Sequence, residues 1–471
     1  MRSKLHQIVL VLAGVVTGIF LSLHFSAVAN KDALTPLPVE ELRAFAEVYG
    51  RIKSDYVEPV DDKKLITEAI NGMLTGLDPH SAYLDQEAYK ELQVGTQGEF
   101  GGLGIEVGME DGFVKVISPI EDTPAHRAGL KAGDLIIKLD DTSVKGMSLN
   151  EAVKRMRGKP NTQITLTVLR KGEAKPFVVT ITRAIIKIQS VKSKLIEPDY
   201  GYIRITQFQE HTGENLVKAV QNLYKQNERD LKGLVLDLRN DPGGLLNGAV
   251  AVAAAFLPKD VLVVYTDGRT ADAKMRLTAS AENYLRGPYR RDYLKDLPTQ
   301  VKSVPMVVLV NGGTASASEI VAGALQDHKR AVVMGTPTFG KGSVQTILPL
   351  GNNTAIKLTT ARYYTPSGRS IQAKGIEPDI LVEDPASSDF EALRLREADL
   401  ERHLSNGQDE GKKDKPSPAG KEPAASPQSD KPKDGAPDSA ERRKPTEFGS
   451  KDDYQLTQAL NLLKGLNIIA K

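Results

Sequence analysis

The chain has 471 residues, with 62 Lys and Arg against 60 Asp and Glu, and it contains no cysteine. The absence of cysteine excludes thiol nucleophiles, disulfide frameworks and Cys-ligated zinc. The near-neutral charge gives no electrostatic argument for a nucleic-acid partner. Neither an HExxH motif nor a GxSxG turn occurs. We therefore expect no metal and no cofactor.

The N-terminus predicts export. Arg2 and Lys4 precede an apolar stretch over 8–25, and Ala27-Val28-Ala29 then matches a small-x-small cleavage site. This pattern is typical of a secretory signal peptide, here residues 1–29, and predicts a periplasmic protein. The lack of disulfides is compatible with that compartment. The alternative is an uncleaved anchor, because the stretch can span a bilayer with some tilt; the protein would then be membrane-associated.

Residues 30–95 have the periodicity of helices. One apolar stripe contains Leu42, Phe45, Ala46, Tyr49 and Ile52, and a second contains Leu65, Ile66, Ile70 and Leu74. A helical unit this short cannot bury much surface alone. We expect it to pack on another subunit or on the main body.

Residues 96–185 change to short strands separated by glycine turns. Strands are expected over 113–117, 135–139, 164–169 and 177–181, with one helix over 148–156. The opening run Gly101-Gly102-Leu103-Gly104-Ile105 lacks the lysine and the following helix of a nucleotide loop. We expect the N–H groups of Gly102, Leu103, Gly104 and Ile105 to receive the terminal carboxylate of a peptide. Residues 105–107 would be an edge strand beside it, and the helix the other wall.

Residues 186–403 alternate strands and helices, which predicts a layered α/β domain with a largely parallel sheet. A polar segment over 268–303 interrupts the alternation with arginines and tyrosines. A nucleic-acid surface can have this composition. Acidic residues are interspersed throughout, however, so we expect a solvated cap over the active-site region.

Ser316 lies where a buried strand over 304–310 passes into a helix expected over 319–328. Free N–H groups and the helix dipole at such a turn favour developing negative charge. Lys341 lies between two glycines, and Gln345 follows on the same face of a strand-like run. His328 is twelve residues from Ser316, roughly 18 Å along a helix, so it cannot serve as its base. Burial can lower the pKa of a lysine enough for that role.

The alternative for this segment is structural. Serines in such turns commonly cap helices, and Ser318, just before Glu319, fits that role. The spacing of Ser316 and Lys341 alone leaves the catalytic and the structural interpretation open.

The C-terminal part divides into a linker and a helix. Residues 404–449 are rich in Pro, Lys, Asp, Ser and Ala and are expected to be a disordered linker. Residues 450–471 place apolar side chains at helical spacing: Leu456, Ala459, Leu460, Leu463 and Leu466. We expect an amphipathic helix that docks to protein, because its polar face is not strongly basic.

Taken together, several motifs resemble the carboxyl-terminal processing peptidases, also called tail-specific proteases, over residues 37–382. The motifs are LDPHSAYL at 77–84, GEFGGLGI at 98–105, DLRNDPGG at 237–244, the Ser316 and Lys341 segments, and YTPSGR at 364–369. The resemblance implies a multidomain α/β protein. Its parts would be the N-terminal helical segment, a β-rich PDZ domain over 96–185, a crotonase-like serine protease core over 186–403, and the C-terminal helix.

The resemblance also implies roles for single residues. Ser316 would be the nucleophile, Lys341 the general base and Gln345 the residue that orients the lysine. Thr314 stands where serine is frequent in the family, which affects none of these roles. An oxyanion donor would come from the glycine pair of the Asp-Pro-Gly-Gly turn; we choose Gly243, which sequence cannot separate from Gly244. Ala317 N–H, directly after the nucleophile, is the natural second donor.

The implied function is a periplasmic serine endopeptidase that cleaves proteins near their C-terminal tails. Its PDZ domain would bind the free C-terminus of a protein or peptide substrate and gate activity. We expect a homo-oligomer with terminal helices at its interfaces, leave open an adaptor or lipoprotein partner, and expect no nucleic acid. Two alternatives are a catalytically inactive PDZ scaffold and a crotonase-type acyl-transfer enzyme acting on a small thioester. The intact Ser316, Lys341 and Gln345 set disfavours the first, and the signal peptide and the peptide-binding domain disfavour the second.

Overall fold

The computed structural model describes residues 37–120, 122–173, 175–286, 291–385, 395–408 and 449–469. The predicted signal peptide and nearly all of the predicted linker lie outside these ranges. Within them, no helix has both the length and the apolar character that a membrane crossing requires. The chain divides into two compact units, the first ending at Gly72 and the second beginning at Met73.

The first unit confirms the predicted helical segment. It contains α2 (Val39–Asp55) and most of α3 (Asp62–Thr75). The two helices are joined at Asp62, which accepts a hydrogen bond from Tyr49 Oη at 2.7 Å and lies 2.6 Å from Lys53 Nζ. No residue of α2 is buried, and its apolar stripe is exposed at Leu42 and Phe45. Within the described part of this unit, therefore, no other residue covers the apolar face of α2.

The second unit opens with a strand and a helix that lead to the middle domain. Strand β1 (Ala82–Leu84) pairs antiparallel with a strand of the distant core, β18 (Ala355–Tyr364). Helix α4 (Gln86–Gln97) is capped by the Asp85 side chain, which accepts a hydrogen bond from Ala88 N at 2.8 Å. The sequence motif around β1 therefore belongs structurally to the core rather than to the helical unit.

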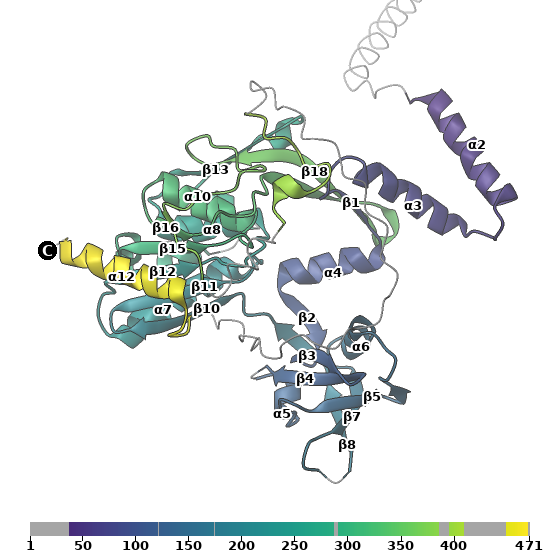
Figure 1. Cartoon of the computed structure of the whole chain (residues 1–471), viewed down its shortest axis with the longest axis horizontal. Coiled ribbons are helices and arrows are strands. Elements are labelled where there is room, and N and C mark those ends of the chain that lie inside the picture. The colour runs from purple at the N-terminus through teal and green to yellow at the C-terminus, as the bar shows by residue number, and fades with distance from the viewer. Residues whose placement is uncertain are drawn as a thin grey trace, which may run out of the picture. The chain divides into compact units, whose positions relative to one another are not determined.

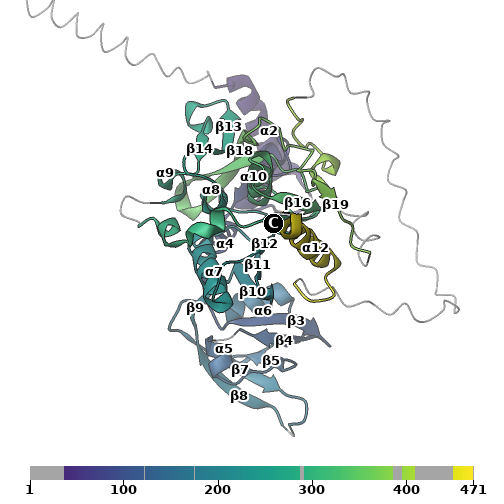
Figure 2. The same cartoon turned by 90° about the vertical axis from the view of Figure 1, so that its left-hand side faces the viewer.

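The middle domain is an antiparallel sheet with strand order β3-β4-β5-β7-β8 (Figures 1 and 2). Alternate residues of its strands, such as Val114 and Val116, point into a closed apolar core. Helix α6 carries a capping box in which Ser148 and Glu151 each bond the other's backbone N–H. The strands and helix predicted from the sequence are all confirmed. The elements are β3 (Ile105–Glu110), β4 (Phe113–Pro119), α5 (Pro124–Arg127), β5 (Leu135–Leu139), β6 (Thr142–Ser143), α6 (Leu149–Met156), β7 (Gln163–Leu169) and β8 (Phe177–Thr182).

A two-stranded ribbon connects this domain to the core. It consists of β2 (Glu99–Gly102) and β9 (Ala184–Lys187), which pair antiparallel. After it the chain builds a six-stranded sheet in the order β10-β11-β12-β15-β16-β19, parallel except between β10 and β11. This confirms the predicted α/β layering. Its elements are β10 (Val191–Glu197), β11 (Tyr200–Ile205), α7 (Thr212–Asn227), β12 (Gly233–Asp237), α8 (Leu246–Phe256), β15 (Met306–Val310), α10 (Ala317–Asp327), β16 (Val332–Gly335) and β19 (Ile380–Leu381).

The two faces of this sheet are covered differently. Leu236 pairs with Ile203 and Val308, and all three pack with α7, α8 and α10 in the main core. The next residue back, Val235, points to the other face, because side chains alternate along a strand. There it packs against α12 (Tyr454–Ile469), which lies along the sheet (Figure 1). The predicted C-terminal helix is thus confirmed, and its apolar stripe is buried on its own chain.

A second, antiparallel sheet has the order β1-β18-β13-β14, with β17 also paired to β18. The segment over 268–303 adds β14 to this sheet and buries Tyr284 and Val301 in the main core, so it is anchored rather than solvated throughout. That it covers the active site stays a prediction. The remaining elements are β13 (Leu262–Gly268), η1 (Ala271–Ala273), β14 (Arg276–Thr278), α9 (Ala281–Tyr284), η2 (Tyr293–Asp296), η3 (Thr299–Lys302), β17 (Ser343–Pro349), η4 (Gly351–Asn353) and η5 (Glu397–Asp399).

Candidate active site

Ser316 occupies the turn between β15 and α10, as the sequence predicts. Its backbone has φ 57° and ψ −115°, a conformation that residues with a side chain rarely adopt. Holding it costs about 1–3 kcal/mol, and such strain clusters at functional sites. The half-buried Ser316 is therefore held in a strained position at the N-terminus of a buried helix.

The expected capping role of Ser318 is wrong. Helix α10 begins at Ala317, two residues earlier than predicted, so Ser316 itself is the N-cap residue and Ser318 lies inside the helix. The Ser318 hydroxyl donates instead to the carbonyl oxygen of Asp241 at 2.9 Å. This bond fastens α10 to the Asp-Pro-Gly-Gly turn.

Glu319 joins the serine turn to the lysine loop, a role that sequence reasoning missed. Its fully buried Oε2 accepts hydrogen bonds from Ser316 N at 2.7 Å and from Lys341 N at 3.0 Å. Its Oε1 accepts from Gly340 N at 2.7 Å and from Thr338 Oγ1 at 2.5 Å. Burial raises the pKa of Glu319 to about 7, although these hydrogen bonds act in the opposite direction. The Ser-x-x-Glu spacing of a capping box was the signal that could have found it.

Lys341 lies in the loop before β17, and its pKa is shifted in the direction that a general base needs. Burial lowers the pKa of Lys341, and the charge of Lys357 lowers it further. The charges of Glu397, Glu319 and Asp78 act in the opposite direction. The result is a lysine pKa below its ordinary value, which increases the neutral fraction that can accept a proton.

The Lys341 loop is also held by residues other than Glu319. Gln372 Oε1 accepts a hydrogen bond from Gly342 N at 2.9 Å, and its Nε2 donates to Glu397 Oε1 at 2.8 Å. Glu397 N in turn donates to Phe339 O at 3.1 Å. The backbone of the lysine loop is thus held by both Glu319 and Gln372.

No hydrogen bond among the described residues joins Lys341 Nζ to Ser316 Oγ. The hydroxyl of Tyr363 lies near the Ser316 side chain and donates to the Lys341 carbonyl oxygen. Burial raises the pKa of Tyr363 well above its ordinary value, so this hydroxyl stays protonated. Tyr363 is a second residue that sequence reasoning missed; nothing in its spacing marked it.

Gln345 lies in β17 and is bonded to neighbours other than the lysine. Its Nε2 donates to Ser343 Oγ at 2.9 Å and to Thr359 Oγ1 at 3.3 Å. Thr359 in turn donates to Asp78 at 3.0 Å. The Gln345 Oε1 accepts from no described residue and is free to accept from the Lys341 ammonium group. That Gln345 orients the lysine stays a prediction.

The Asp-Pro-Gly-Gly turn lies directly against Ser316. A Cβ at Gly243 would lie 2.9 Å from Ser316 Cβ and 2.8 Å from Ala317 N, and φ is +94°, so only glycine fits. The Gly243 N–H, our expected oxyanion donor, is engaged with Asp241 Oδ1 at 2.8 Å. The N–H groups of Gly244 and Ala317 donate to no described residue. Both remain available to an oxyanion.

The loop predicted to bind a C-terminus lies where expected in the middle domain. Gly102 ends β2, and Ile105 begins β3, an edge strand of the sheet. Leu103 is buried, and Gly104 has φ +79°, with Thr123 too close for any side chain. Neither the Leu103 N–H nor the Gly104 N–H donates to another residue of the described chain. The loop therefore offers unpaired donors beside an open strand edge.

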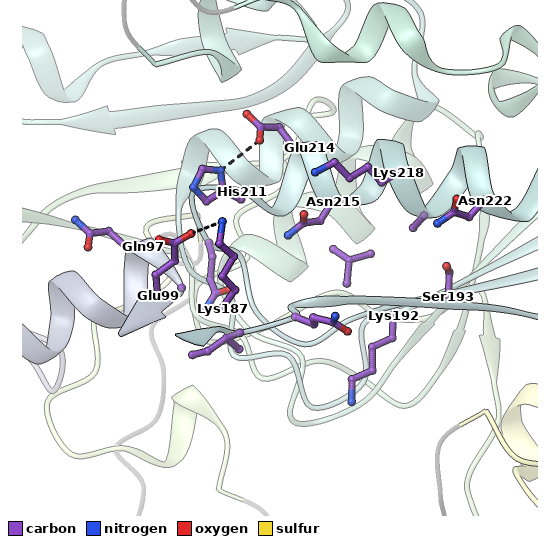
Figure 3. Close-up of a pocket in the computed structure, with 16 residues that line it drawn as sticks. Gln97, Glu99, Lys187, Lys192, Ser193, His211, Glu214, Asn215, Lys218 and Asn222 are labelled. Carbon is purple, nitrogen blue, oxygen red and sulfur yellow. Dashed lines mark hydrogen bonds and ion pairs between the residues drawn. The ribbon is translucent and has the colours of Figure 1, made fainter. Parts of the chain in front are cut away.

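A polar pocket of about 590 Å³ lies elsewhere, at the junction of the middle domain and the core (Figure 3). It is bounded by the free edge of β10, the first turns of α7 and the connecting ribbon. Lys187 pairs with Glu99 at 3.2 Å, and His211 with Glu214 at 3.3 Å. Neither Ser316 nor Lys341 lines this pocket, so it lies at the junction between domains and apart from the candidate catalytic residues.

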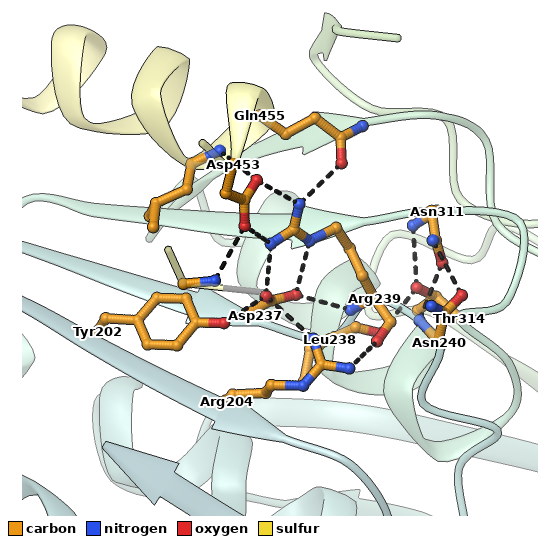
Figure 4. A network of polar contacts seen from close by, with 12 residues as sticks. Tyr202, Arg204, Asp237, Leu238, Arg239, Asn240, Asn311, Thr314, Asp453 and Gln455 are labelled. Carbon is orange, nitrogen blue, oxygen red and sulfur yellow. Dashed lines mark hydrogen bonds and ion pairs between the residues drawn. The ribbon is translucent and has the colours of Figure 1, made fainter. Parts of the chain in front are cut away.

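A buried network supports the strand that leads into the Asp-Pro-Gly-Gly turn (Figure 4). Arg239 Nη2 lies 2.7 Å from Asp237 Oδ2 and 2.6 Å from Asp453 Oδ2, and its Nη1 bonds Gln455 Oε1 at 2.9 Å. Burial alone would raise the pKa of Asp237, but the Arg239 and Arg204 charges hold it below its ordinary value. The residues at the start of α12 are therefore bonded to Arg239, which lies two positions before Asp241 of the turn.

Comparison with known proteins identifies the family. Residues 199–382 match the family model described as Peptidase family S41, residues 101–181 that of the PDZ domain, and residues 22–88 that of the activating protease CtpB N-terminal domain. The carboxy-terminal-processing protease of Bartonella bacilliformis is 48% identical over 405 residues, covering 84% of this chain and 88% of that protein. The chain belongs to the carboxy-terminal processing proteases.

A second curated relative agrees with this assignment. The carboxy-terminal processing protease CtpB of Bacillus subtilis is 38% identical over 355 residues, covering 74% of this protease and 70% of that one. A solved photosystem II D1 C-terminal processing protease is 32% identical, with a TM-score of 0.39, covering 72% of this chain and 86% of that one. The expected resemblance and the expected combination of a PDZ domain with an α/β protease core are confirmed. Within the described residues, no group of His, Asp and Glu is arranged to hold a metal ion.

Proposed function

We propose that this protease is a periplasmic serine endopeptidase that cleaves proteins near their C-terminal tails, with Ser316 as nucleophile and Lys341 as general base. The observation that carries the proposal is the shared bond to Glu319. One carboxylate oxygen accepts from the backbone N–H groups of both residues, which fixes the serine turn beside the lysine loop. The predicted signal peptide supports the periplasmic location.

In the reaction, neutral Lys341 accepts the proton of Ser316 as the serine oxygen attacks the peptide carbonyl. The oxyanion that forms is stabilised by the N–H groups of Ala317 and of the glycine pair. Expulsion of the amine gives an acyl-enzyme, which water hydrolyses. Gln345 Oε1 directs the lysine amine toward the serine. Lys341 Nζ and Ser316 Oγ share no hydrogen bond in the described residues, so this arrangement precedes the productive one, as is common before substrate binds.

Substrate selection is proposed to lie in the PDZ domain. The free N–H groups of Leu103 and Gly104 would bind the terminal carboxylate, and the substrate would add as a strand to the open edge of β3. The junction with the core contains the polar pocket of Figure 3 rather than a packed apolar interface. Such junctions permit domain movement. A bound tail would gate the protease by favouring the arrangement that binds it more tightly.

One experiment tests chemistry and tail recognition together. A model substrate with an apolar tail is prepared with a free and with an amidated C-terminus, and kcat/KM is measured for the wild type, Ser316→Ala, Lys341→Ala and Lys341→Arg. We expect each substitution to lower turnover by about 10³-fold or more. Arginine should not rescue the lysine, because it stays protonated. Lys225→Ala, an exposed lysine on α7, is the control and should match the wild type.

Amidation should lower kcat/KM of the wild type roughly 10- to 100-fold, since hydrogen bonds to a charged group contribute about 1.5–3 kcal/mol. Retained activity in Lys341→Ala would reject the Ser–Lys assignment. Equal rates for the acid and the amide would instead reject tail recognition by the PDZ loop.

A further inference from the structure

Asp241, in the Asp-Pro-Gly-Gly turn, is a buried acid that the mechanism above does not use. Its side chain is fully buried; Oδ1 accepts the Gly243 N–H at 2.8 Å, and Oδ2 has no hydrogen-bond partner among the described residues. Its carbonyl oxygen accepts from Ala315 N at 2.9 Å and from Ser318 Oγ at 2.9 Å. One residue therefore fastens the glycine turn to the nucleophile turn.

The charged groups around Asp241 are committed to other partners. Arg204 of β11 lies 3.1 Å from Asp237 of β12, and Asp237 is held by Arg239. Glu319 of α10 accepts from the backbone of the lysine loop. Asp241 forms no ion pair with any residue that the structure describes. An ionised carboxylate here would thus be dry and unpaired, which is costly.

Ionisation would also oppose catalysis. The turn that Asp241 holds lies against Ser316 Cβ and Ala317 N, where the oxyanion develops. A second negative charge beside it would raise the energy of the transition state, because the site is shielded from water. A protonated carboxyl keeps the bond to Gly243 without adding that charge.

We propose that Asp241 is a positioning residue that holds the glycine turn against Ser316, and that the protease works with this carboxyl protonated. The inference rests on the proposed serine mechanism. Burial raises the pKa of Asp241 to about 7; the Gly243 hydrogen bond and the Arg204 charge act against this, and the Asp237 charge adds to it. The carboxyl therefore ionises within the range where an exported protease operates, and activity should be lost as it does.

The raised pKa of Asp241 also determines how the stability of the folded protein depends on pH. The folded protein binds this proton more tightly than the unfolded chain, whose aspartate has the ordinary pKa of 3.8. The contribution of the Asp241 carboxyl to the free energy of unfolding is therefore largest at low pH. It falls as pH rises from about 4 to about 7, and it stays low above that. With a residue that cannot ionise at this position, the protein should not lose this stability as pH rises.

The test is Asp241→Asn, which keeps the shape and the acceptor for Gly243 but cannot ionise. The ratio of variant to wild-type kcat is measured from pH 5 to pH 9, because the titration of Lys341 cancels in that ratio. We expect a constant ratio below pH 6 and a rise of about tenfold per pH unit above 7. Asp241→Ala should lower kcat at every pH, since Gly243 loses its acceptor. Asp230→Asn, an exposed acid, should give a flat ratio throughout.

A second readout does not depend on activity. In a Ser316→Ala background, Asp241→Asn should raise the unfolding temperature at pH 8 and not at pH 4. A flat kcat ratio, or an equal rise in unfolding temperature at pH 4 and pH 8, overturns the inference about Asp241. Full activity of Ser316→Ala itself would overturn the serine mechanism instead, so the two failures are distinguishable.

Discussion

At the scale of single residues, the pKa of Lys341 is a balance between burial and nearby charge. Burial and Lys357 lower it, whereas Glu397, Glu319 and Asp78 raise it. Of these acids, Glu397 is held by His80 Nε2 at 2.8 Å and by Gln372 Nε2 at 2.8 Å. Burial alone would raise the pKa of Glu397, but these partners hold it below its ordinary value. Glu397 is therefore ionised at neutral pH and opposes deprotonation of the lysine.

We predict that Glu397→Gln moves the acid limb of kcat/KM to lower pH. Removing the negative charge lowers the pKa of Lys341, so the neutral lysine that is proposed to accept the Ser316 proton is present at lower pH. The loss of one neighbouring negative charge shifts the pKa of a lysine by about 1 unit. The pH profile of kcat/KM measures the shift, with the exposed Glu401→Gln as control. A limb that stays in place, or moves to higher pH, would show that Glu397 does not set the lysine pKa.

Sequence patterns located some residues of this site and not others, for physical reasons. Ser316 and Lys341 follow local rules, a strand-to-helix turn and a glycine-flanked loop, and both features are present. Glu397 and Tyr363 act only through contacts made after folding, which no spacing encodes. Ser318 was misassigned because the helix begins two residues earlier than its apolar periodicity suggests.

At the scale of elements, α12 illustrates the same limit. Its bounds could be predicted because a stripe of leucines at helical spacing is a local signal. The surface on which it docks could not be predicted. An apolar stripe indicates that a helix is covered, but it does not indicate which residues cover it. The structure places Leu456, Leu460 and Leu463 on the sheet face formed by Tyr202, Val235 and other residues. The expectation that the terminal helices lie at oligomer interfaces is therefore not met by this stripe of α12, which is buried on its own chain.

We predict that Leu463→Ala lowers the free energy of unfolding by about 2–5 kcal/mol, because the lost side chain leaves a cavity between α12 and the sheet. Leu463 is fully buried, whereas Leu466 on the same helix is 38% exposed and supplies the matched control. Urea unfolding of both variants measures the difference. If Leu466→Ala costs as much as Leu463→Ala, the helix does not pack on the sheet in this register.

At the scale of the whole molecule, the uncovered face of α2 bears on assembly. Leu42 is 49% exposed and Phe45 48% exposed, and they belong to the stripe predicted from the sequence. An amphipathic helix with an uncovered stripe commonly buries it against a partner. We predict that a second copy of this chain covers it, giving a homo-oligomer.

Light scattering on the chain lacking residues 1–29 should give a mass above that of one chain, and Leu42→Lys with Phe45→Lys should reduce it to a monomer. Glu47→Lys, on the opposite face of α2, should leave the mass unchanged. A monomer at micromolar concentration before any substitution would contradict self-association through this helix.

The bond between Arg239 and Asp453 also orders events in time. The two residues are 214 positions apart in the chain. Ribosomes add about 5–20 residues per second, so Arg239 exists for roughly 10–40 seconds before its partner is made. Ser316 and Lys341 are both synthesised within that interval, while the support beneath the glycine turn is still missing. A nascent chain would thus carry the proposed nucleophile and base without the finished scaffold, which is completed only once Asp453 has been made.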